Sequence, residues 1–165
     1  MPELTAADYE KIAATLYANL GKAVWTIQHL EDALSHSIAI KNPEITTRKK
    51  GDEILNSNRK LTLGQAVKLA KKENTYSDSL QKRLQDFLTE RNWLVHKCMR
   101  ESVNEMGLVK VPDELFEQIK TVQITALSLK EAIEIDMLEF AKANGRGDIV
   151  EKVRKAYIEW VKTNI

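Results

Sequence analysis

The stretch "ERNWLVHKCMR", residues 90–100, holds three side chains suited to phosphate chemistry close together. Arg91 carries a planar guanidinium that can bind a phosphate through two hydrogen bonds, and Asn92 carries an amide that can orient a bound group. His96 titrates near neutral pH and can therefore transfer protons. These residue types can together form a polar pocket for phosphate.

A helix over residues 77–101 places Arg91 in the middle of an apolar stripe. The other members of the stripe are Leu80, Leu84, Phe87, Leu88, Leu94, Val95 and Cys98. Asn92 and His96 lie one turn apart on the edge of the stripe, whereas Arg91 and His96 project about 140° apart and about 7.5 Å apart along the axis. These two side chains converge only through the long arginine side chain, or they meet the same groups from an opposing chain.

Two interpretations fit an arginine in an apolar stripe, which costs free energy unless it is paired or faces a wet cavity or a polyanion. In the first, Arg91 pairs with a buried acid such as Glu31, and His96 is a structural residue at the edge. In the second, Arg91, Asn92 and His96 form the phosphate pocket. Spacing alone favours the first.

The apolar spacing is helical along nearly the whole chain, so we expect an all-α bundle. The first helix begins at Thr5, an N-cap candidate with Asp8 three positions on, and ends before Pro43. Residues 42–61 are the least regular part, with a short helix around "GDEIL". Further helices follow over residues 62–73 and 77–101, then from Asp113 and from 148 to about 163, with "NEMGLVKVPD" as a connection.

Length and composition limit the class of protein. At 165 residues we expect a single domain over 1–165, and a net charge of +1 excludes attachment to nucleic acid by bulk charge alone, though not through a local basic patch. The sequence has no apolar run of about 18 residues and no signal peptide, so we expect no membrane partner. A lone cysteine and no spaced Cys/His cluster indicate a cytoplasmic protein without a structural metal.

The motif and its surroundings resemble the HEPN superfamily. "RNWLVH", Arg91–His96, is similar to the Arg-x4-6-His signature of HEPN domains, with the usual polar residue after the arginine, here Asn92. "LTLGQAVKLAKKEN" resembles the Leu-Gly helix that often precedes the motif helix in bacterial members. "AVWTIQHLEDALSH" resembles their first long helix, which carries an acidic residue facing the motif. The likeness covers residues 20–105.

This resemblance implies a HEPN-like bundle built on two long antiparallel helices plus shorter helices, which dimerises with its motif helices apposed. It also implies an endoribonuclease of toxin or defence type that uses no metal and no cofactor, with RNA as substrate and a cognate antitoxin as a possible partner. His96 would transfer protons, Arg91 would stabilise the charge of the transition state, and Asn92 would position the phosphate or His96. Other members are catalytically silent, so a module that binds RNA, a nucleotide or a protein partner is the alternative.

Further residues have supporting roles under the same reading. Glu31 and Asp32 are both candidates for the acidic residue, and Glu31 lies nearer the buried face, although a solvated flank charge fits it equally. Lys97 and Arg100 are candidate contacts to the RNA backbone, although exposed charges on a helix are more often only solvated. A basic stretch fits either an RNA-approach surface or a solvated loop; it comprises Arg48, Lys49, Lys50, Arg59 and Lys60. Three tryptophans can stack on bases or pack against helices: Trp25, Trp93 and Trp160.

Overall fold

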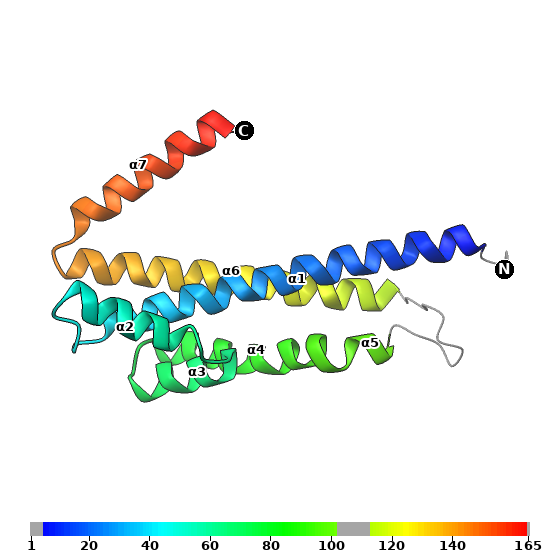
Figure 1. The fold of residues 1–165 in the computed structure, drawn as a ribbon, viewed down its shortest axis with the longest axis horizontal. Coiled ribbons are helices and arrows are strands. Elements are labelled where there is room, and N and C mark those ends of the chain that lie inside the picture. Colours follow the sequence, from blue (N-terminus) through cyan, green and yellow to red (C-terminus); the bar gives the residue numbers. More distant parts are fainter. Residues whose placement is uncertain (1–4, 102–112, 165) are drawn as a thin grey trace.

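The computed structural model describes residues 5–101 and 113–164, and every regular element in these ranges is an α-helix (Figure 1). The helices are α1 (Ala6–Lys41), α2 (Arg48–Asn58), α3 (Leu63–Lys72), α4 (Asp78–His96), α5 (Cys98–Glu101), α6 (Asp113–Ala143) and α7 (Gly147–Asn164). The prediction of an all-α bundle is confirmed. The expected connection over 104–112 lies outside the described residues.

Local capping signals explain where the helices begin. The Thr5 hydroxyl accepts a hydrogen bond from the Asp8 backbone N–H, and the Asp8 carboxylate accepts one from the Thr5 N–H, which completes the expected capping box. Thr62 and Gln65 form the same arrangement at the start of α3. A further expectation was too modest, because the short helix around "GDEIL" extends over the whole of α2.

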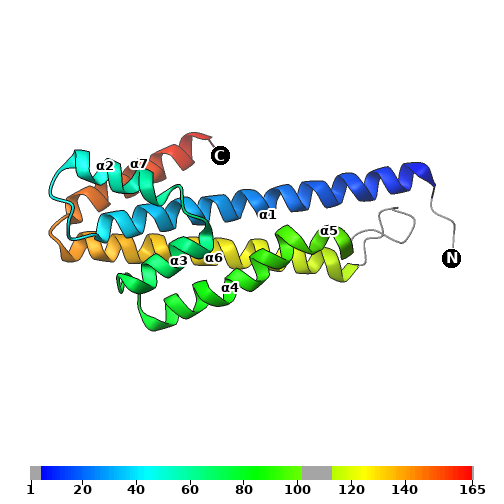
Figure 2. The ribbon, with the colours of Figure 1, turned by 60° about the horizontal axis from the view of Figure 1, so that its bottom comes forward.

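The two longest helices, α1 and α6, run side by side in the same direction (Figures 1 and 2). Lys41 at the end of α1 pairs with Asp136 near the end of α6, which fixes this direction. The expectation that the two long helices are antiparallel is therefore wrong. The reason is α4, which runs opposite to both and returns the chain to the end of the bundle where α1 begins, so that α6 starts there too.

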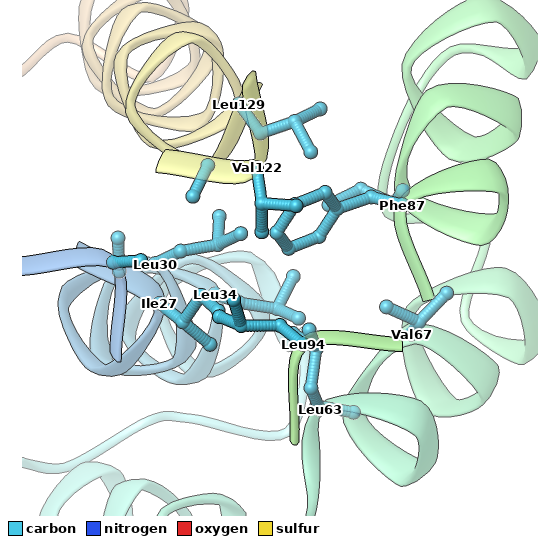
Figure 3. Packing of buried hydrophobic residues seen from close by; sticks show 14 of the residues in the cluster. Ile27, Leu30, Leu34, Leu63, Val67, Phe87, Leu94, Val122 and Leu129 are labelled. Atoms are coloured by element: carbon cyan, nitrogen blue, oxygen red, sulfur yellow. The ribbon is translucent and has the colours of Figure 1, made fainter. Parts of the chain in front are cut away.

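The core lies where α1, α4 and α6 meet, and α3 covers one side of it (Figure 3). Phe87 of α4 points toward Val122 of α6, while Leu30 and Leu34 of α1 close the interior. All four side chains are almost completely buried. Truncating a buried phenylalanine to alanine typically costs about 3–5 kcal/mol, so Phe87 is the side chain on which this packing depends most.

The last helix diverges from the bundle (Figures 1 and 2). A short turn at 144–146 separates α7 from α6, and Gly145 occupies the left-handed region there with φ +75°. The motif helix α4 lies on the other side of the α1–α6 pair from α7 in Figure 1.

Within residues 5–101 and 113–164 no helix combines the length and apolar character needed to cross a membrane.

Candidate functional site

The motif lies at the C-terminal end of α4, where α3 no longer covers the helix. Most of the predicted stripe is buried, and Arg91 lies among it with 26% of its side chain exposed. Val95 departs from the prediction, since it is 49% exposed. The reason is that α3 flanks only the preceding turns of α4, through the Gln81 hydrogen bond to Val67 and the approach of Gly64 to Leu88.

The guanidinium of Arg91 has few partners. Its Nη1 donates a hydrogen bond of 3.3 Å to Asn92 Oδ1, and its Nη2 lies 4.0 Å from Glu31 Oε1. The second distance is too long for a hydrogen bond, and Nε is buried with no hydrogen-bond partner among the described residues. A guanidinium has five N–H donors, so Arg91 keeps unused donors at a site that is already partly desolvated.

Glu31 links three helices around this arginine. It lies on α1, it faces Arg91 of α4, and its carboxylate accepts a hydrogen bond from the backbone N–H of Leu63 in the first turn of α3. Burial raises the pKa of the Glu31 carboxyl, and the opposing effects of Arg91 and the Leu63 N–H do not cancel this increase. Asp32, the other acidic candidate, accepts a hydrogen bond of 2.9 Å from Arg59 of the α2–α3 turn instead.

His96 and Asn92 form the open edge of the site. Both side chains are exposed, and they lie one helical turn apart. Within the part of the chain that the structure describes, the His96 imidazole has no hydrogen bond and no ion pair. It is therefore available to an incoming group.

The helix was expected to continue to Glu101, but α4 ends at His96 and α5 restarts at Cys98. Lys97 closes α4 through its N–H, which donates to the Trp93 carbonyl. The Lys97 side chain, like that of Arg100, is exposed beside the motif. The motif histidine thus lies at a helix end, next to a break in the regular backbone.

The structure brings Arg91, Asn92 and Glu31 together, and it keeps His96 apart from Arg91. Because α4 is regular up to His96, the two side chains project about 140° apart around its axis. A single chain therefore presents the guanidinium and the imidazole on different faces of α4, with Asn92 between them. Bringing both to one phosphate requires side-chain movement or a second chain.

The tryptophans differ in placement. Trp93 packs against the core, which is one of the two roles expected for it. Trp25 is 64% exposed on α1 and makes an edge contact with the His29 ring at a centroid distance of 5.1 Å. The side chain of Trp160 lies outside the described residues.

Lys41 is a second partly buried cation, which the sequence did not identify. Lys41 is 11% exposed; its Nζ pairs with Asp136, donates a hydrogen bond of 3.0 Å to the Thr75 carbonyl and lies over the rings of Tyr76 and Phe140. The ring centroids are 4.8 and 5.8 Å from Nζ. The signal in the sequence was its position, because residue 41 continues the spacing of Leu34 and Ile38 on the buried face of α1.

Across the described residues no group of three or more His, Cys, Asp or Glu side chains is placed to hold a metal ion. Comparison of the chain with protein-family models, with curated proteins and with solved structures finds no match.

Proposed function

We propose that this protein is a HEPN-type endoribonuclease that acts as a homodimer, needs no metal, and serves in a toxin or defence system under the control of a cognate antitoxin. The observation that carries the proposal is the unsaturated guanidinium of Arg91, held half-buried beside the exposed Asn92 and His96. A desolvated cation with unused donors binds a phosphate more strongly than a solvated one.

The reaction would proceed through the RNA itself. The 2′-hydroxyl attacks the adjacent phosphorus, the bond to the 5′-oxygen of the next nucleotide breaks, and a 2′,3′-cyclic phosphate and a 5′-hydroxyl are left. His96 transfers the proton between the attacking and leaving oxygens. Arg91 stabilises the additional negative charge on the phosphorane-like transition state, and Asn92 keeps the guanidinium and the phosphate in register.

In a dimer, Arg91 and His96 from different chains can reach the same phosphate. Two apposed α4 helices would place Arg91 of each chain opposite His96 of the other, which removes the 140° separation within one helix. The surface around the motif suits such a contact, because Val95 is 49% and Met99 is 75% exposed there. This exposed apolar area adjoins the polar groups of the site.

One observation favours an alternative. Arg91 Nη2 lies 4.0 Å from Glu31 Oε1, so a small side-chain movement would convert this contact into a structural ion pair. In that case the protein is a catalytically silent HEPN-type module that binds RNA, a nucleotide or a protein partner through the same surface.

The test is cleavage of a single-stranded RNA by the purified protein in the presence of EDTA. We expect products with 2′,3′-cyclic phosphate ends and no cleavage when the scissile nucleotide carries a 2′-deoxy sugar. We also expect expression of the wild type, and not of His96→Ala, to arrest growth. Cleavage that EDTA abolishes and Mg²⁺ restores, or normal cleavage of the deoxy substrate, would contradict the mechanism.

A further inference from the structure

Charge is distributed unevenly over the bundle although the whole chain carries only +1. Residues 54–72, from the second half of α2 to the end of α3, contain five basic residues and no acidic residue. Helix α6 contains seven acidic and three basic residues. Positive charge is therefore concentrated in this segment, and the net value of the chain conceals it.

The centre of this charge is the outer face of α3. Lys68, Lys71 and Lys72 lie at i, i+3 and i+4, so that they share one side of the helix, and all three are exposed. The opposite side of α3 is buried against the core through Val67 and Ala70. The three lysines thus form a row that faces solvent.

These lysines have no ion-pair partners within residues 5–101 and 113–164, in contrast to one lysine of α4 and one of α6. Lys82 pairs with Asp86 at 2.8 Å, and Lys130 pairs with Glu134 at 2.7 Å. Cations in the last turn of a helix are favoured by the helix dipole, which accounts for Lys71 and Lys72. Lys68 lies one turn earlier, so the dipole does not account for the whole row.

Helix α3 begins beside the motif, and its lysine row runs from there toward the start of α4. The first residue of α3, Leu63, donates its N–H to Glu31, the acid that faces Arg91. A Cβ on the following Gly64 would lie 4.0 Å from Leu88 of α4, so α3 directly flanks the motif helix. Lys68 and Lys72 follow about 6 and 12 Å further along α3.

We infer that the α3 lysine row, Lys68, Lys71 and Lys72, is the surface that holds the sugar-phosphate backbone of the substrate and leads it to Arg91. The assignment of RNA as the bound polyanion rests on the proposed function. Lysine ammonium groups contact phosphates without reading bases, so the row supplies affinity and leaves sequence choice to other groups. Binding at the row should also not distinguish RNA from DNA, because no contact to the 2′-hydroxyl is involved.

The experiment measures binding of a labelled single-stranded RNA of mixed sequence, and of DNA of the same sequence, to the full chain carrying His96→Ala, which keeps the RNA intact. In this background Lys68, Lys71 and Lys72 are changed together to Gln. The matched control changes Lys82, Lys120 and Lys130 to Gln, since each of these pairs with an acid in its own helix. Both triple variants lose the same formal charge.

We expect the α3 variant to bind both nucleic acids at least about tenfold more weakly and the slope of log affinity against log salt to fall by about 2, because each lost single-strand phosphate contact removes about 0.7. The control should bind as the His96→Ala parent does. Equal losses in both triple variants, an unchanged salt slope in the α3 variant, or no binding by the parent would overturn the inference. If the lysines are required for binding but the wild type cleaves no RNA, the row is a nucleic-acid binding surface and the proposed endoribonuclease activity is wrong.

Discussion

Two partly buried cations differ in their surroundings: Lys41 lies at the C-terminal end of α1, and Arg91 lies near the C-terminal end of α4. Lys41 pairs with Asp136, donates to the Thr75 carbonyl and lies over two aromatic rings, so its charge is met on several sides. Arg91 has one hydrogen bond to its neighbour Asn92 and a 4.0 Å contact with Glu31. A saturated cation binds elements of the fold together, whereas an unsaturated one keeps its donors for a ligand.

The difference also appears in the acids that face these cations. Asp136 forms a close pair with Lys41, which crosses from α6 to the end of α1. The Glu31 carboxylate is partly buried and accepts a hydrogen bond from the α3 backbone. Burial raises its pKa despite the nearby arginine. The net effect of its surroundings on the charged form is unfavourable, so the Arg91–Glu31 contact contributes little to stability. Lys41 therefore contributes to stability, whereas under the proposed function Arg91 serves the chemistry.

The largest effect should come from removing the proton-transfer group near Arg91. His96→Ala should lower the cleavage rate about 10²–10⁴-fold, the usual contribution of general acid–base catalysis. The exposed imidazole has no partner among the described residues, so the melting temperature should not change. Single-turnover cleavage and thermal unfolding of the same preparation measure the two quantities. A variant with full activity would leave only the binding module standing.

Substitution of Arg91 tests the unsaturated cation directly. Arg91→Ala should cost about 3–4 kcal/mol of transition-state stabilisation, by comparison with lost oxyanion donors. Arg91→Lys should be nearly as inactive, because a point charge does not replace a planar bidentate donor. Arg91→Met, which fills the same position in the apolar stripe, should change the unfolding free energy by less than about 1 kcal/mol. A large loss of stability in Arg91→Met would make Arg91 a structural residue like Lys41.

Substitution of Lys41 should have the opposite profile. Lys41→Met leaves the Asp136 carboxylate without its counter-charge, and the loss should be about 3 kcal/mol, near the lower limit for breaking a buried pair, because Asp136 is 32% exposed. The double variant with Asp136→Leu should recover much of that loss. Urea unfolding measures both, and cleavage per folded molecule should stay at the wild-type rate. Loss of activity without loss of stability would reverse the comparison.

The sequence predicted the surroundings of Arg91 better than those of Lys41, for a physical reason. Local signals lie close together along the chain: the capping box of Thr5 and Asp8, the helical period, and an arginine within an apolar stripe. Long-range partners carry no such signal. The pair between Lys41 and Asp136 joins residues 95 positions apart, and a lysine at a helix end is ordinarily solvated.

The parallel course of α1 and α6 and the exposure of Val95 were missed for the same reason. Both depend on which helix packs where, and the period of a single helix does not determine its neighbours. Val95 continues the stripe in sequence, but α3 is too short to cover it. The break at Lys97 has no signal of its own, since neither glycine nor proline occurs between 91 and 101.

The smallest effect, and the finest test of the comparison, comes from Glu31→Gln. Since the folded protein raises the pKa of this carboxyl, the native state retains the proton at a pH where the unfolded chain has lost it. The unfolding free energy of the wild type therefore falls as pH rises from about 4.5 through the folded-state pKa, and it stays lower above that. Glutamine does not ionise, so the variant lacks this decline, and its stability relative to the wild type should increase from acid to neutral pH. Urea unfolding of both proteins across this range isolates Glu31, because all other groups titrate alike. If Glu31 were instead a clamp on Arg91 as Asp136 is on Lys41, the variant would lose most stability at neutral pH, where both charges are present.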